Sequence, residues 1–170
     1  MKYIVLLVFG LWFSDWVRFE DSNLGFSILL PNLPVIDSQD VETDIGNIFT
    51  KTYISTLGNG RNETVLMVNV TRYPQDFYLD RDDSISIYIM ETIKESLLMN
   101  YGTLVYEEDT ELNGYKTNLS LIHNADDVAI KTAMIVKGNR LYTIQSISPF
   151  EDRLKPEVEK FFNSFRLMQL

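Results

Sequence analysis

Carboxylates are the most numerous side chains in this sequence that could do chemistry, and one group of them precedes a helical pattern. This group consists of Asp80, Asp82 and Asp83. Their spacing lacks the central glycine and the distant glutamate of a calcium-binding loop. Acidic side chains at a helix start accept backbone N–H bonds and interact favourably with the helix dipole. Helix capping is therefore favoured over a cation site.

A second acidic group lies on one predicted hairpin. Its members are Glu107, Glu108, Asp109 and Glu111. Residues of a strand alternate between its two faces, so these four cannot all reach one ion. A solvated edge is the favoured interpretation, although Glu107 and Asp109 share a face and could join a binding surface. Asp126 and Asp127 indicate a turn.

His123 is the only histidine. It cannot make a multi-histidine metal site, and no serine near it has the spacing of a nucleophile elbow. The predicted hairpin register places it opposite Leu104, so a hydrogen-bonded histidine at a strand end is favoured over a catalytic base. Nothing in the sequence brings a particular carboxylate pair together for acid–base hydrolysis. The sequence therefore predicts no catalytic residue, no cofactor-binding residue and no metal ligand.

Three further kinds of motif are better explained by local structure or by chance than by a function. Glycosylation acceptors begin at Asn62, Asn69 and Asn118, and two of them fall inside predicted strands. The glycine-rich segment 58–60 lies between strands, so it lacks the context of a phosphate-binding loop. The Pro-x-x-Pro segment 31–34 is interpreted as a loop that ends a strand, rather than as a polyproline ligand.

Composition narrows the possible functions further. The 170 residues are 45% hydrophobic and 12% aromatic, which fits one folded domain. The net charge of −9 disfavours nucleic acid and anionic membrane surfaces as partners, because both need a basic surface. The absence of cysteine excludes disulfides, thiol nucleophiles and cysteine-ligated metals.

The first residues predict an export signal. Lys2 precedes the apolar segment Tyr3 to Phe13, which Ser14 follows. This layout is typical of a secretory signal, and the segment is too short to span a bilayer. We therefore predict a signal peptide over residues 1–14 and a single domain over residues 15–170, in the periplasm or secreted. No clear small-x-small cleavage site follows, and the alternative is a buried first strand in a cytoplasmic protein.

The remaining positions predict strands, then a helix, then two hairpins and a closing helix. Five strands are predicted at residues 16–20, 26–30, 41–45, 48–57 and 64–72. The first hairpin turns at Asn113-Gly114 and pairs Leu112 with Tyr115, Thr110 with Thr117, Tyr106 with Leu121 and Glu111 with Lys116. The second turns at Gly138-Asn139 and pairs Val136 with Leu141, Ile135 with Tyr142 and Ala133 with Ile144. Both faces of the second hairpin are apolar, so its strands should be central.

Two helices are expected to cover the sheet. One begins near Asp80 or Asp82, ends at Gly102 and buries a stripe of Ile85, Ile89, Ile93 and Leu97 with Tyr88 beside it. A capping box is predicted at residues 148–151. The closing helix begins near Pro156 and buries Val158, Phe161, Phe162 and Phe165. These elements predict an α+β fold in which helices cover an antiparallel sheet, as an α/β/α layered sandwich.

Two short segments point to a known group of proteins. The domain opens with Gly25-Phe26-Ser27-Ile28-Leu29-Leu30-Pro31 and Pro34, and it closes with Phe161-Phe162-Asn163-Ser164-Phe165-Arg166-Leu167. In these segments the chain resembles PsbP-like and Mog1-like domains, including uncharacterised secreted bacterial members. The resemblance implies an antiparallel sheet sandwiched by helices, and a tendency not to be catalytic. Photosynthetic members support the water-oxidising complex in the thylakoid lumen, and Mog1 members bind a small GTPase. No functional motif of either kind matches this chain.

Three functions are compatible with the sequence. The favoured one is a secreted or periplasmic, non-enzymatic accessory domain that binds a protein partner. The second is a cytoplasmic regulator that binds a small GTPase through its acidic face. The third is a carboxylate-based hydrolase assisted by His123 or a tyrosine. No nucleic acid, cofactor or stable membrane span is expected.

Overall fold

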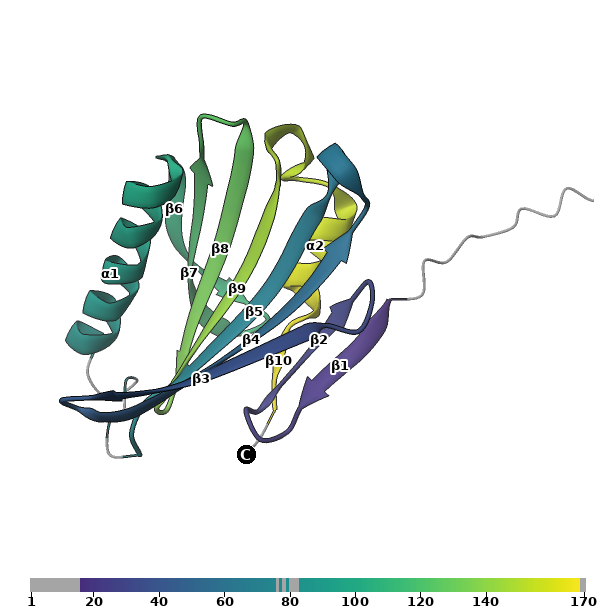
Figure 1. Cartoon of the computed structure of the whole chain (residues 1–170). Helices are drawn as coiled ribbons and strands as arrows, with labels where there is room; N and C mark the ends of the chain where they lie inside the picture. The colour runs from purple at the N-terminus through teal and green to yellow at the C-terminus, as the bar shows by residue number, and fades with distance from the viewer. Residues whose placement is uncertain (1–15, 76, 78, 80–82, 169–170) are drawn as a thin grey trace, which may run out of the picture.

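The computed structural model describes residues 16–75, 77, 79 and 83–168, and their strands form two antiparallel sheets (Figure 1). The larger sheet has seven strands in the order β3-β4-β5-β9-β8-β7-β6, and the smaller has three in the order β1-β2-β10. The strands of the larger sheet are β3 (Val35–Thr43), β4 (Gly46–Leu57), β5 (Thr64–Arg72), β6 (Thr103–Leu112), β7 (Tyr115–His123), β8 (Val128–Lys137) and β9 (Arg140–Pro149). The remaining strands and the two described α-helices are β1 (Val17–Asp21), β2 (Phe26–Leu30), β10 (Arg166–Leu167), α1 (Asp83–Tyr101) and α2 (Pro156–Ser164).

The larger sheet is covered on both faces. Helix α1 lies against one face, and α2 with the small sheet lies on the other (Figure 1). The predicted α+β class is confirmed in its coarse form, because helices cover a sheet whose pairs are antiparallel. The layered-sandwich prediction was incomplete, because the small sheet forms much of the second layer. Its third strand, β10, comes from the C-terminal segment and has no local pairing signal.

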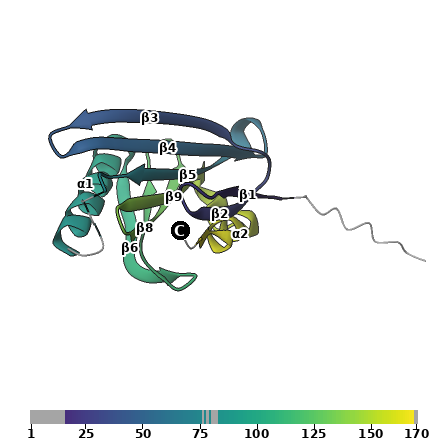
Figure 2. The same ribbon diagram turned by 90° about the horizontal axis from the view of Figure 1, so that it is seen from below.

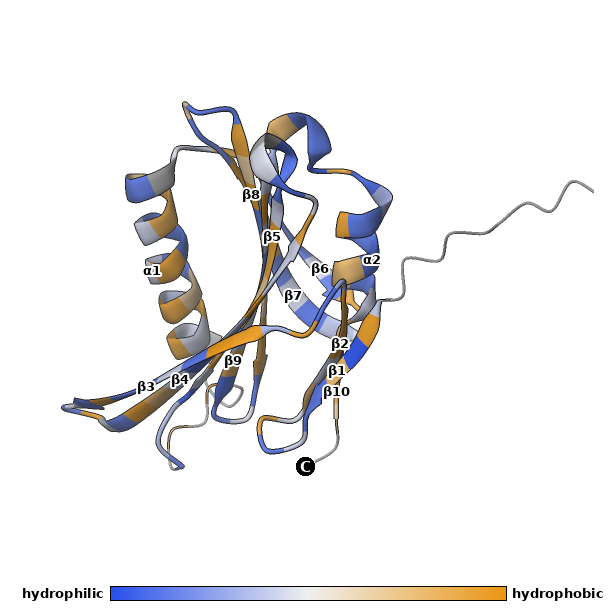
Figure 3. Ribbon diagram, turned by 45° about the vertical axis from the view of Figure 1, so that its right-hand side comes forward, coloured by the Kyte–Doolittle hydropathy of each residue, from blue (hydrophilic) through white to orange (hydrophobic). Residues whose placement is uncertain are grey.

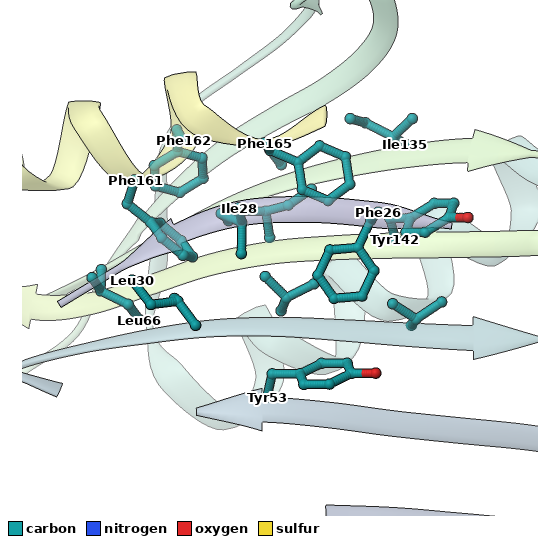
Figure 4. Packing of buried hydrophobic residues seen from close by; sticks show 14 of the residues in the cluster. Phe26, Ile28, Leu30, Tyr53, Leu66, Ile135, Tyr142, Phe161, Phe162 and Phe165 are labelled. Atoms are coloured by element: carbon teal, nitrogen blue, oxygen red, sulfur yellow. The ribbon is translucent and has the colours of Figure 1, made fainter. Parts of the chain in front are cut away.

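Most of the core lies between the large sheet and the layer that contains α2. The predicted stripe on α2 is confirmed, because Val158, Phe161, Phe162 and Phe165 are all buried. Phe165 stacks on Phe26 of β2 with ring centroids 5.9 Å apart (Figure 4). Pro156 occupies the first turn, where its missing N–H costs no helical hydrogen bond.

The two predicted hairpins are confirmed, with every predicted residue pair except that of His123 with Leu104. Asn113 and Gly114 have φ of 55° and 84°, the left-handed pair that a tight hairpin turn requires. Strands β8 and β9 are central in the larger sheet, as their two apolar faces predicted. Alternation and turn chemistry therefore fixed this half of the sheet locally.

The predicted position of His123 was wrong by one residue. A register shift between Leu104 and Tyr106 makes His123 pair with Thr103, while Leu104 pairs with Ile122. An extra residue in one strand of a pair produces such a β-bulge. No turn residue announces it, so simple counting outward from the turn missed it.

The first hairpin of the larger sheet also differs from the prediction. Strand β3 begins directly after Pro34 and turns at residues 44–45, whereas we predicted a strand at 41–45 and a turn at 46–47. Proline lacks only its own N–H, and Pro34 lies just outside the ladder. The predicted capping box at 148–151 was wrong too, because β9 continues to Pro149 and pairs with Val128.

Helix α1 packs more loosely than we predicted. Three residues of the predicted stripe pack on the buried side chains of Leu79, Met134 and Leu141. These three, Ile85, Ile89 and Ile93, are themselves only partly buried. Tyr88 was predicted to lie beside them and is instead 71% exposed. Figure 3 shows that the hydrophobic residues of α1 gather on its side toward the sheet. Asp80 and Asp82, and the segment Tyr3 to Phe13, lie outside the described residues.

Candidate functional site

Strand β3 is one of the two outer strands of the larger sheet, the other being β6, and it has β4 as its only neighbour there (Figure 2). Eight of its nine residues are exposed. The backbone N–H and C=O groups on its outer side therefore have no strand to pair with among the described residues. An open edge of this length is a template for an additional strand.

The side chains of this edge are apolar and acidic. The exposed apolar residues at or next to the strand are Leu33, Val35, Ile36, Val41 and Ile45, and Val35 is 72% exposed. The acidic residues are Asp37, Asp40 and Glu42, and β3 contains no lysine or arginine. We call this strand with Leu33 and Ile45 the β3 edge. Its chemistry suits an extended segment that supplies backbone hydrogen bonds, apolar side chains and cations.

Sequence analysis missed a buried polar cluster that links the two sheets. Lys51 Nζ donates to Asp21 Oδ2 at 2.9 Å, and Tyr53 Oη donates to the same oxygen. The backbone N–H of Leu24 donates to Asp21 Oδ1 at 3.0 Å. Burial opposes ionisation of Asp21, but these hydrogen bonds outweigh it and lower the pKa of the carboxyl. Burial and the Asp21 carboxylate raise the pKa of Tyr53.

This cluster has a structural role rather than a chemical one. The Asp21 side chain is only 9% exposed, so substrate cannot reach its oxygens freely. Two of its donors, Lys51 and Tyr53, come from β4 and fix the small sheet on the large one, and the third, the N–H of Leu24, lies in the turn after β1. A pairing over 32 positions in sequence leaves no local signal, which explains why it could not be predicted.

The acidic hairpin residues are divided between the sheet faces as predicted. Asn118 Nδ2 donates to Glu107 Oε1 at 3.0 Å and to Asp109 Oδ1 at 3.2 Å, so these two carboxylates lie together. Lys94 Nζ of α1 bonds Glu107 Oε2 at 2.9 Å. Partial burial opposes ionisation of Glu107, but the bonds from Lys94 and Asn118 prevail and lower its pKa. A carboxyl with a lowered pKa stays ionised and is unsuited to donate a proton.

His123 lies at the end of β7, as predicted, and forms a small surface cluster. Its Nε2 lies 2.8 Å from Asp127 Oδ1, and its ring stacks on Phe150 at 3.8 Å between centroids. Asp127 has a φ of 59°, which fits the predicted turn. Thr103 Oγ1 donates to the backbone carbonyl of His123 at 3.3 Å, and among the described residues the hydrogen bonds place no serine or threonine hydroxyl on its imidazole ring. The cluster therefore closes the β7–β8 turn.

The remaining sequence candidates are not assembled into a site. Within residues 16–75, 77, 79 and 83–168, no group of three acidic or histidine side chains is placed to hold a metal ion. Asn69 donates to Thr52 Oγ1 at 2.7 Å within the sheet. Asn69 and Asn118 both lie in strands, which is unusual for glycosylation acceptors. None of the described helices is long and apolar enough to cross a membrane.

Comparisons with known proteins define the class of fold. The chain resembles the solution structure of cyanobacterial PsbP (CyanoP) from Synechocystis sp. PCC 6803, with a TM-score of 0.55 and 16% identity over 93% of this chain and 95% of that one. The chain thus has a PsbP-like fold, and the resemblance found in its sequence is confirmed at that level. A crystal structure of a protein from Bacteroides thetaiotaomicron VPI-5482 matches with a TM-score of 0.45 and 11% identity, over 89% of this chain and 48% of that one. No protein-family model and no curated protein matches the sequence.

Proposed function

We propose that this chain is a non-enzymatic accessory domain that binds a protein partner outside the cytoplasm. The observation that supports this function most strongly is the open β3 edge with its exposed apolar residues. A soluble domain normally protects such an edge, because it invites pairing with another chain. An edge kept open is therefore a candidate binding surface.

The charge of the β3 edge selects the kind of partner. A second copy of the chain would bring the acidic residues of two β3 strands close together, and like charges across a strand pair are unfavourable. Asp37, Asp40 and Glu42 favour instead a segment with lysine or arginine. The proposed partner thus contributes an extended, basic and partly apolar segment that adds to the sheet beside β3.

The N-terminal segment supports a location outside the cytoplasm. Lys2 and the apolar residues from Tyr3 to Phe13 have the layout of an export signal. N-terminal sequencing of the protein from separated cell compartments tests this part of the proposal. We expect a mature chain that begins after residue 14 in the extracytoplasmic fraction. An intact Met1 in the cytosol would contradict it and favour a cytoplasmic regulator.

The non-enzymatic assignment is supported by the chemistry of the paired carboxylates. A hydrolase needs one carboxyl that holds its proton near neutral pH and one that does not. Glu107 and Asp109 lie together, but Lys94 and Asn118 favour the ionised form of Glu107. We expect Glu107→Gln to leave any trace hydrolytic activity of a purified preparation unchanged. A specific loss of activity in this variant would contradict the proposal.

The binding proposal is tested with two charge-reversed double variants. Asp37→Lys with Glu42→Lys alters the β3 edge, and Glu63→Lys with Glu95→Lys alters exposed sites elsewhere. Both pairs raise the net charge from −9 to −5, so long-range attraction changes equally. Co-purification from the extracytoplasmic fraction should recover the same basic protein with the wild type and with the Glu63 and Glu95 variant. Equal recovery by the Asp37 and Glu42 variant would contradict docking at this edge.

A further inference from the structure

A groove separates the first half of α1 from strands β6 and β7. Its volume is about 640 Å³, which lies within the range of small-molecule sites. Ser86, Ile87 and Met90 line the groove on the helix side, and Met134 and Val136 of β8 form its apolar floor. The groove lies at the β6 end of the sheet, whereas the β3 edge lies at the other end. It is thus independent of the surface proposed for partner binding.

The groove exists because α1 contacts the sheet mainly through one stripe. Ile85, Ile89 and Ile93 pack toward Leu79 and Leu141, on the side of β9. Met90 packs on the same cluster at the edge of this contact, and Ile87 lies outside the cluster and lines the groove. Ile87 is 54% exposed although it is a large apolar residue. The helix therefore presents apolar surface to the groove without a side chain to cover it.

The walls of the groove are suited to an adaptable apolar ligand. Methionine side chains are flexible and polarisable, and they fit ligands of different shape. Met90 and Met134 contribute such side chains from the helix and from the sheet. Among those described, no apolar residue of α1 is fully buried.

The opposite rim of the groove is acidic. Asp109 and Glu111 line it on β6, with Lys116 across on β7. The groove continues along α1 into a second hollow of about 400 Å³, where Glu91, Glu107 and Glu108 join Asp109. Lys94 is already bonded to Glu91 and Glu107. On this face of the sheet four carboxylates, those of Glu91, Glu107, Asp109 and Glu111, face two lysines, so the surroundings favour a cation over an anion.

We propose that this groove binds a small molecule with an apolar body and a protonated amine. The apolar body would lie on Met134 and Val136 beside Ile87, and the ammonium group would lie against Asp109 and Glu111. Hydrophobic burial supplies the affinity, and the carboxylates supply the preference for the cation. Neither the PsbP-like fold nor the proposed protein partner implies such a ligand.

The proposal is tested with three probes of equal chain length: n-octylamine, 1-octanol and octanoate at pH 7. The readout is the methyl NMR spectrum of methionine-labelled full-length protein. Met90 and Met134 lie in the groove, whereas Met67 and Met99 lie outside it and serve as internal controls. We expect shifts at the two groove methionines only, with octylamine binding most tightly and octanoate most weakly. Equal binding of octanoate, or equal shifts at all four methionines, would overturn the proposal.

Two variants separate the charge contribution from the apolar one. Asp109→Asn with Glu111→Gln should weaken octylamine binding by about fivefold and leave octanol within about twofold. Asp37→Asn with Glu42→Gln, on the β3 edge, is the matched control and should change neither. Ile87→Trp places a larger ring at an exposed position of the groove wall and should weaken all three probes. If octylamine binding is unchanged in the Asp109 and Glu111 variant or in Ile87→Trp, the probe binds elsewhere.

Discussion

At the scale of single residues, Asp21 makes the polar contact that joins the small sheet to the large one. It is the last residue of β1, and it accepts hydrogen bonds from Lys51 and Tyr53 of β4. A buried carboxylate is costly unless it is fully hydrogen-bonded. Three donors satisfy the Asp21 carboxylate, and two of them, Lys51 and Tyr53, form a specific contact between the small sheet and the large one.

We expect Asp21→Asn to lower the free energy of unfolding at pH 7 by about 1–3 kcal/mol, because the charge-assisted bonds are lost. The measurement is urea unfolding followed by circular dichroism. Asp44→Asn is the control, since Asp44 lies exposed in the turn before β4 and should change stability little. Equal stability of the Asp21 and Asp44 variants would contradict the role given to this cluster.

The same cluster predicts a pH dependence with a definite sign. The pKa of Asp21 is lowered on folding from an ordinary value of 3.8. Its contribution is therefore fully present above about pH 5, well above the unfolded pKa, and is lost as the pH falls through the lower, folded-state pKa. The stability difference between wild type and Asp21→Asn should shrink between pH 5 and about pH 2. A difference that grows on acidification would contradict this account.

At the scale of elements, the junction between α1 and β6 depends on one glycine. Gly102 follows the helix with a φ of +145°, and its N–H bonds the carbonyl of Leu98 at 3.3 Å. A Cβ atom placed there would lie 2.3 Å from the carbonyl oxygen of His123. Gly102 thus ends the helix, as predicted, and also lets the β7–β8 turn approach.

Gly102→Ala should destabilise the protein by clearly more than 1 kcal/mol, because both the backbone conformation and the space reject a methyl group. Gly114→Ala is the matched control. Gly114 also has a positive φ, of 84°, but nothing lies within 4 Å of an added Cβ. Thermal unfolding of the two variants measures the difference. A larger loss in Gly114→Ala would contradict the crowding described at Gly102.

Elements with local signals could be predicted from the sequence, and those set by distant contacts could not. Asn113-Gly114 and the alternation around it fixed β6 and β7 apart from the bulge at Leu104 to Tyr106. The Phe stripe of α2 likewise has a local period. Strand β3 could not be predicted in full, because its exposed residues lack the alternation that a buried face imposes. The contacts of Asp21 and the groove beside α1 arise only when segments distant in sequence come together.

At the scale of the whole molecule, the proposed partner binding depends on how charge is distributed over the fold. The net charge of −9 is spread over a PsbP-like fold, and the β3 edge combines that charge with exposed apolar residues. Partner binding at this edge should weaken as salt rises, because exposed charges are screened. We expect about a tenfold or greater loss of affinity between 50 mM and 500 mM NaCl, measured by calorimetry with the purified partner. Affinity that does not change with salt would contradict a basic partner segment.

The most direct test of the central claim is site-specific photocrosslinking from the β3 edge in intact cells. A photoreactive residue replaces Val35 in one variant and Leu154, which is 62% exposed and far from β3 in sequence, in a control. We predict that Val35 crosslinks to one extracytoplasmic protein, through a segment rich in lysine or arginine, and that Asp37→Lys with Glu42→Lys abolishes the product. No product above that of the Leu154 control, or a product that persists after charge reversal, would contradict the claim that this edge binds the partner.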